Sequence, residues 1–175
     1  AAKQKVAGYG MDLRTVLATS GFDAIKRGLP GRDKQIAYLL DVVHAMGEAG
    51  IPVLAYNFKL LNSKLLRSAP TQGRGTSTYI SFDYDEYLKK PAPPISPALS
   101  EQQVFDNLAY FLKALVPAAE KACVRMALHP DDPPVPAGTP ALAGAGHVVS
   151  SFEQYQKIFD IVPSRSNGML FCQGC

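Results

Sequence analysis

The sequence lacks a long apolar run, a strong charge imbalance and a leader-like start. No apolar run among its 175 residues reaches the roughly 18 residues that cross a bilayer, and residues 1–10 lack the apolar core of a secretion signal. The 18 Lys and Arg residues nearly balance the 15 Asp and Glu residues and form no basic block, which disfavours nucleic-acid binding. We therefore expect a cytoplasmic protein with neither a nucleic-acid nor a membrane partner.

Cysteine is also scarce. The three cysteines, Cys123, Cys172 and Cys175, are too few and too clustered for a disulfide framework, and a cytoplasmic compartment would keep them reduced. A catalytic or metal-binding role for one of them stays open.

What the sequence does contain is an alternation of short apolar runs with longer stretches of helical periodicity. This alternation predicts βα units and an α/β fold with a mostly parallel sheet. The expected strands cover residues 14–19, 51–57, 124–129 and 168–172, and the expected helices cover about 33–49, 100–122 and 150–162.

The connections between these elements are unequal in length. The links from helix to strand are short, whereas the links from strand to helix, 20–32, 58–99 and 130–149, are long and hold most of the Gly and Pro residues. In parallel α/β folds the functional site lies at the carboxyl ends of the strands, where such loops begin. The alternative for the segment 58–99 is a tolerated surface excursion without a role in a site.

Several polar side chains fall at those carboxyl ends. Asn57, His129 and Cys172 each end or closely follow an expected strand, and imidazole and thiolate groups are good ligands for divalent transition metals. Taken singly, His129 also fits a loop or capping histidine, and Cys172 fits a buried structural thiol. Asp131 and Asp132 could orient His129, hold substrate hydroxyls or cap the following turn.

Four strings, in this order, carry a resemblance to a known family over nearly the whole chain. The chain resembles mannonate dehydratase, a metal-dependent (β/α)₈ barrel related in fold to xylose-isomerase-like enzymes. His-Pro-Asp-Asp-Pro-Pro is the most specific of the matching elements. The strings are GRDKQI (31–36), GIPVLAYNF (50–58), YFLKALVPAAEKACVRMALHPDDPP (110–134), within it MALHPDDPP (126–134), and SNGMLFCQG (166–174).

The resemblance implies a hydro-lyase that converts D-mannonate to 2-dehydro-3-deoxy-D-gluconate and water with Mn²⁺, Fe²⁺ or another divalent ion. It makes His129 and Cys172 the metal ligands, and Asn57 and Asp131 are our candidates for hydrogen bonds to the sugar acid. Two alternatives stay open: a sugar isomerase or epimerase on the same barrel, and a non-catalytic homologue or structural subunit.

The chain also departs from the family pattern. It reads Ser20-Gly21-Phe22-Asp23 where the family tends to have Pro-Val-His-Glu, it lacks the Trp of a Trp-x-Arg-Thr string near Arg67, and Ala141 stands where an Arg follows Pro140. The family's further metal ligands, a His and an Asp from later strands, have no counterpart here. These differences lead us to expect altered substrate contacts.

Length points to a partial barrel. A closed (β/α)₈ barrel needs eight strands and about 250 residues, whereas four strands are expected here. We therefore expect residues 1–175 to form a single partial TIM-barrel domain of about four βα units, with a long loop insertion at 58–99. Open parallel edges would be completed by the rest of a longer protein, by a partner chain or by a homo-oligomer.

Overall fold

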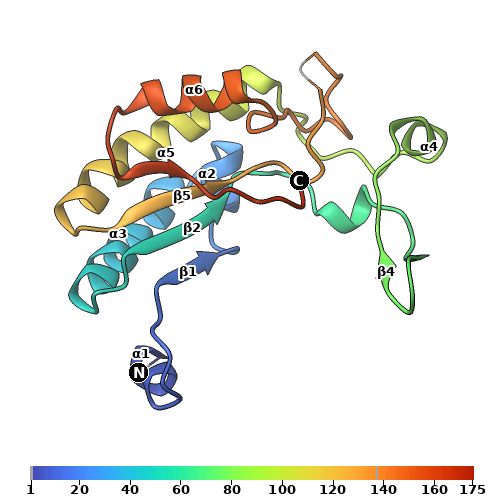
Figure 1. The fold of residues 1–175 in the computed structure, drawn as a ribbon. Coiled ribbons are helices and arrows are strands. Elements are labelled where there is room, and N and C mark those ends of the chain that lie inside the picture. The colour runs from blue at the N-terminus through green and yellow to red at the C-terminus, as the bar shows by residue number, and fades with distance from the viewer. Residues whose placement is uncertain (1, 137) are drawn as a thin grey trace.

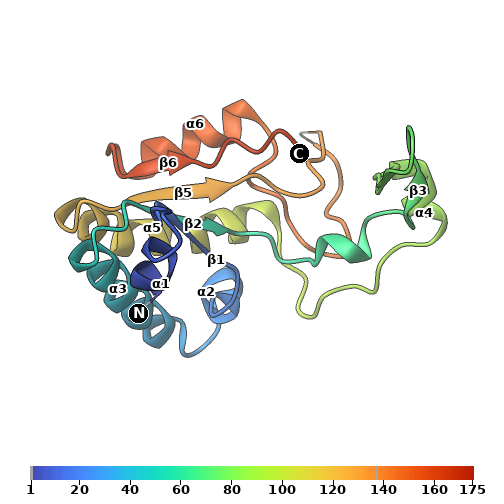
Figure 2. The same ribbon diagram turned by 60° about the horizontal axis from the view of Figure 1, so that its bottom comes forward.

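A computed structural model describes residues 2–136 and 138–175. The centre of the structure is a curved sheet with helices along one side. A smaller group of elements extends beyond one end of that sheet (Figures 1 and 2). In chain order the elements are α1 (Ala2–Ala7), β1 (Thr15–Ala18), α2 (Asp23–Arg27), α3 (Arg32–Glu48), β2 (Val53–Asn57), the 3₁₀ helix η1 (Ser63–Leu65), β3 (Thr71–Gln72), β4 (Thr78–Tyr79), α4 (Tyr84–Lys89), α5 (Glu101–Lys121), β5 (Arg125–His129), α6 (Phe152–Ile161) and β6 (Asn167–Met169).

The main sheet has four strands in the order β1-β2-β5-β6, and every neighbouring pair is parallel. This confirms the expected parallel α/β arrangement, wound in sequence order as consecutive βα units are. The register pairs Asn57 with His129, so two expected site residues end adjacent strands at the same edge. Strand β6 is shorter than expected: after Leu170 donates its N–H to the Leu128 carbonyl, the chain leaves the sheet before it reaches Cys172.

Burial explains why the long helices form where the sequence predicts them. Helix α5 begins at a capping box, in which the Ser100 hydroxyl accepts the Gln103 N–H and the Gln103 side chain accepts the Ser100 N–H. Its apolar face lies against β2 and β5, and Phe111 stands among the rings of Tyr56 and Phe58 with centroid distances of 5.4 and 6.0 Å. Helices α2, α3, α5 and α6 thus share one core with the sheet.

The opposite side of the sheet has no helix among the described residues. Leu17 on β1 is 53% exposed, and the register places it in one row with Ala55 and Ala127, which also point to this side. In a closed barrel such residues fill the interior. This interior-type surface, the row of Leu17, Ala55 and Ala127, is open to solvent at its Leu17 edge, whereas Ala55 is 1% exposed.

The segment 58–99 is not the simple loop that the sequence suggested. It holds η1, the antiparallel pair β3–β4 and α4, which Figure 1 shows beyond the carboxyl end of β2. Its apolar side chains share a second small core with the loop after β5, so the two long loops support each other. That core contains Leu61, Leu66, Tyr87, Ala92, Val135, Leu142 and Ala145. No helix in the described part of the chain is long and apolar enough to span a membrane.

Candidate metal centre and the adjoining pocket

His129 and Cys172 come together beyond the carboxyl ends of β5 and β6, and Cys175 joins them. One potential ligand atom from each of the three lies within 4.8 Å of the other two. The Sγ atoms of Cys172 and Cys175 are 3.6 Å apart, and all three side chains are partly exposed. Only modest movement would place these atoms at the roughly 2.0–2.3 Å that zinc-type ions need.

The His129 ring has a defined orientation. Its Nδ1 lies 2.6 Å from the Pro130 carbonyl oxygen. A carbonyl can only accept, so Nδ1 is the donor in this contact, and Nε2 is the ring nitrogen left for a metal ion. A backbone contact of this kind fixes the tautomer of many metal-binding histidines.

Cys175 is a member that the sequence reasoning passed over. Burial and the adjacent Cys172 raise the pKa of the Cys175 thiol to about 12. Without a neighbouring cation this side chain therefore remains a thiol at neutral pH. The Cys-x-x-Cys spacing of Cys172 and Cys175 was the available signal, because such spacing is common in metal and redox sites.

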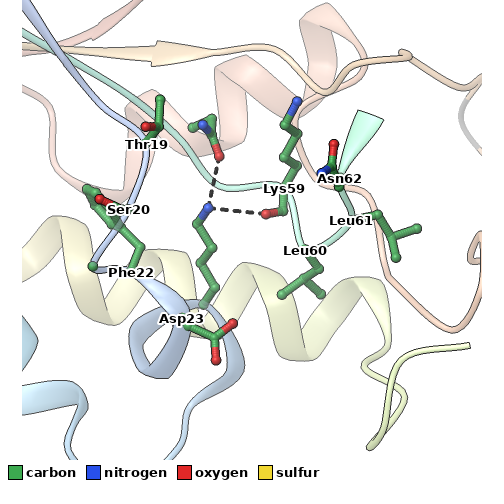
Figure 3. A pocket seen from close by; sticks show the side chains of 11 residues that line it. Thr19, Ser20, Phe22, Asp23, Lys59, Leu60, Leu61 and Asn62 are labelled. Atoms are coloured by element: carbon green, nitrogen blue, oxygen red, sulfur yellow. Dashed lines mark hydrogen bonds between the residues drawn. The ribbon is translucent and has the colours of Figure 1, made fainter. Parts of the chain in front are cut away.

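A polar pocket of about 610 Å³ opens at the carboxyl ends of β1 and β2, at the same edge of the sheet, whereas Cys172 and Cys175 line a separate pocket of about 360 Å³. Figure 3 shows Thr19 and Ser20 on one side of it and Lys59 and Asn62 on the other. Asn57, predicted as a substrate contact, lines the pocket, and its Oδ1 accepts a 2.8 Å hydrogen bond from the Lys26 ammonium.

Lys26 was missed because it lies in α2, a five-residue helix too short to show a period in the sequence. Its side chain is only 8% exposed, and burial together with the nearby Lys59 lowers its pKa to about 8. Only a weak signal for its burial is present in the sequence. Lys26 is four residues after Phe22 and one after Ile25, which are both buried, and positions three or four apart share one helical face.

Asp131, the other predicted substrate contact, is 4% exposed. Its Oδ2 accepts hydrogen bonds from the Val149 N–H at 3.0 Å and the Ser150 hydroxyl at 3.2 Å, and His147 Nδ1 lies 3.7 Å away. This arrangement ties the loop after β5 to the start of α6. It corresponds to the capping alternative and leaves little of the carboxylate for a substrate.

Asp132 points elsewhere. It forms an ion pair with Arg67, and its Oδ2 lies 3.9 Å from the Lys59 ammonium. The loop that follows β2 is thereby held against the loop that follows β5.

Comparison with known proteins agrees with this arrangement. Residues 95–175 match the family model of D-mannonate dehydratase (UxuA). The chain is 28% identical to the mannonate dehydratase of Lactococcus lactis subsp. cremoris, over 99% of this chain and 55% of that protein. It is also 28% identical to the mannonate dehydratase of Streptococcus pneumoniae, over 98% of this chain and 52% of that protein.

The crystal structure of mannonate dehydratase from Streptococcus suis serotype 2 superposes with a TM-score of 0.81 at 28% identity, covering 95% of this chain and 48% of that one. The chain therefore spans about half the length of the relatives it matches, and its four βα units have the arrangement expected of a partial TIM-barrel fold. In sequence and in fold the chain is therefore similar to mannonate dehydratases over nearly its whole length.

Proposed function

We propose that this chain carries part of the active site of a metal-dependent sugar-acid dehydratase that removes water from D-mannonate. The observation that carries the proposal is the convergence of His129, Cys172 and Cys175 at the carboxyl ends of the strands, the sheet edge at which the polar pocket also opens. The relationship to mannonate dehydratases supports the choice of substrate and of reaction.

The metal would be held in part by His129 and Cys172, with the Cys175 sulfur within reach. A donor set of imidazole and thiolate is softer than the oxygen ligands that Mn²⁺ prefers, so Fe²⁺ suits this group better. When bound, a divalent ion supplies Lewis-acid polarisation of substrate oxygens, which acidifies the proton beside the carboxylate and assists loss of hydroxide. An open catalytic site usually has three or four protein ligands.

The chain's own side chains would then hold the sugar acid. The Lys26 ammonium donates a hydrogen bond to Asn57 Oδ1. The Asn57 Nδ2 group is therefore free to donate to a substrate hydroxyl. Asp131 acts as a positioning residue through its bonds to Val149 and Ser150, rather than as a direct contact. Pro130 fixes the His129 ring through its carbonyl.

The test is to supply the intact protein with Fe²⁺ or Mn²⁺ and D-mannonate and to measure a 2-keto-3-deoxy acid. We expect this product, and we expect His129→Ala to lower its rate by more than about 100-fold, since metal-dependent polarisation is lost. His44→Ala, on the exposed side of α3, is the matched control and should keep the activity.

Two results would overturn the proposal. Interconversion of keto and aldo sugars without release of water would indicate an isomerase on the same fold. Metal binding without turnover of any sugar acid would indicate a non-catalytic relative.

A further inference from the structure

The Lys26 ammonium is an unusual group in this molecule because it is buried without an anionic partner. It donates to Asn57 Oδ1 at 2.8 Å and to the Lys59 carbonyl oxygen at 3.2 Å. An ammonium has three N–H donors, so one is left. No ion pair joins it to a carboxylate within the described ranges, 2–136 and 138–175.

The surroundings hold this charge in place instead of neutralising it. The Asn107 side chain donates to the Lys26 carbonyl at 2.9 Å, which anchors α2 on α5, and the Lys26 stem lies over the Phe22 ring, with Nζ 5.6 Å from its centroid. The charged groups that act on the ammonium are Lys59, Asp23 and Asp131. A buried ammonium lacking a close counter-ion is destabilising on its own, which is the condition that a bound anion relieves.

The same ammonium lines the 610 Å³ pocket together with the positively charged Lys59. Pockets of about 300–1,000 Å³ are of the size that holds small molecules. Hydroxyl and amide groups of Thr19, Ser20 and Asn62 complete the polar part of the lining. The lining also holds one carboxylate, Asp23, so the pocket combines two lysines with one acid and several neutral donors and acceptors, a pattern that suits a polyhydroxy acid.

We infer that this pocket is an anion subsite in which Lys26 binds the carboxylate of the sugar acid. The inference rests on the proposed function for the identity of the acid. Asn57, which contacts Lys26, pairs in register with His129 on the adjacent strand, and neighbouring strands lie about 4.8 Å apart. The pocket and the group formed by His129, Cys172 and Cys175 therefore lie at the same edge of the sheet, and a sugar acid held at Lys26 by its carboxylate would extend along that edge to reach this group.

Binding to the intact protein, measured by calorimetry after dialysis against EDTA, tests the subsite without turnover. The probes are D-mannonate, the uncharged D-mannitol and inorganic phosphate. We expect Lys26→Met to weaken D-mannonate binding at least about tenfold, because the carboxylate loses the buried ammonium that pairs with it. Any D-mannitol binding should stay unchanged, because D-mannitol has no charge. Lys26→Arg keeps the charge and should retain a measurable part of the affinity.

Lys34→Met, an exposed lysine on α3, is the matched control and should bind D-mannonate like the wild type. Circular dichroism of Lys26→Met shows whether a loss of binding reflects loss of the subsite or loss of the fold. If Lys26→Met does not fold, Lys26→Arg still tests the inference. A folded Lys26→Arg variant that no longer binds D-mannonate would overturn it.

The remaining outcomes separate the subsite from the proposed reaction. D-Mannonate binding that depends on Lys26, without dehydration by the metal-loaded protein, would overturn the proposed function and support the subsite. Unchanged D-mannonate binding in folded Lys26→Met would overturn the subsite, even if dehydration is observed. Loss of phosphate binding alone in that variant would also overturn it, because the pocket would then serve a phosphate.

Discussion

A single residue, Lys26 of α2, gives the first prediction through its protonation. Because the pKa of Lys26 is lowered to about 8, the ammonium loses its proton as the pH rises through that value. D-Mannonate binding should therefore be strongest near neutrality and weaken between about pH 8 and pH 9.5, whereas Lys26→Arg, whose guanidinium stays charged, should show little change.

Calorimetry across this pH range measures the effect. Asp23 and Asp131 are the carboxylates that act on Lys26, and Lys59→Arg separates any contribution of the second lysine in the pocket. A wild-type affinity that stays constant up to about pH 9.5 would show that the Lys26 charge does not hold the acid.

The sulfur atoms give the second prediction. Co²⁺ bound by thiolates has a charge-transfer absorption in the near ultraviolet, so its intensity reports how many sulfurs bind the ion. We expect Co²⁺ to produce this band in the intact protein, Cys172→Ser to remove most of it, and Cys175→Ser to lower it, because both sulfurs lie in the group with His129.

The third cysteine supplies the control. Cys123 is exposed and lies directly before the strand β5, at the end opposite to His129, so Cys123→Ser should leave the band unchanged. A band that survives Cys172→Ser, or that depends on Cys123, contradicts the assignment of the metal group.

Helices and strands decide whether these residues meet, and at this scale α5 is the central element. Phe111 is 1% exposed and lies 5.7 Å from Phe22, just before α2, and 5.4 Å from Tyr56 on β2, measured between ring centroids. Phe111→Ala should lower the free energy of unfolding by about 3–5 kcal/mol, through lost burial and a cavity.

Urea denaturation followed by circular dichroism measures this change. Phe152→Ala on α6 is the matched control, since Phe152 is 80% exposed and its loss should change the free energy of unfolding by less than about 0.5 kcal/mol. Similar effects of the two substitutions would contradict the assignment of the core.

The sequence predicted the elements whose burial is periodic and missed those whose contacts are local. Helix α5 was predictable because its capping box and its apolar stripe both point to the same helix. Helices α1, α2 and α4 were not, since five or six residues cannot display a helical period. Strands β3 and β4 have two residues each and are exposed, so they carry no alternation to detect.

The same reasoning applies to the site. His129 and Cys172 could be placed at one sheet edge because strand order follows chain order in a sequentially wound sheet. Their role as metal ligands stays a prediction. Lys26 is buried, and the Asp131 carboxylate accepts a hydrogen bond from the Val149 N–H. Both features depend on how the loops fold over the strand ends, and no periodic pattern in the sequence encodes that.

At the scale of the whole molecule, the sheet is open. Strands β1 and β6 are its two edges, and parallel edges present unpaired N–H and C=O groups that favour association. The interior-type surface adds apolar area, with Leu17 53% exposed on β1. The relatives, about twice as long, have chain available to cover such a surface.

The last prediction concerns residues 1–175 expressed alone. We expect this segment to self-associate in sedimentation velocity experiments and to bind a hydrophobic dye, because an exposed barrel interior and open edges are covered most readily by a second copy. Leu17→Asn should weaken the association by removing apolar area from the interior-type surface. Tyr38→Asn, on α3 and 63% exposed, changes an equally accessible side chain on the helical side and should not. The prediction is contradicted if the segment stays monomeric at high concentration and binds no dye. The interior-type surface would then be stable in water, and neither a partner chain nor a second copy would be needed for a stable fold.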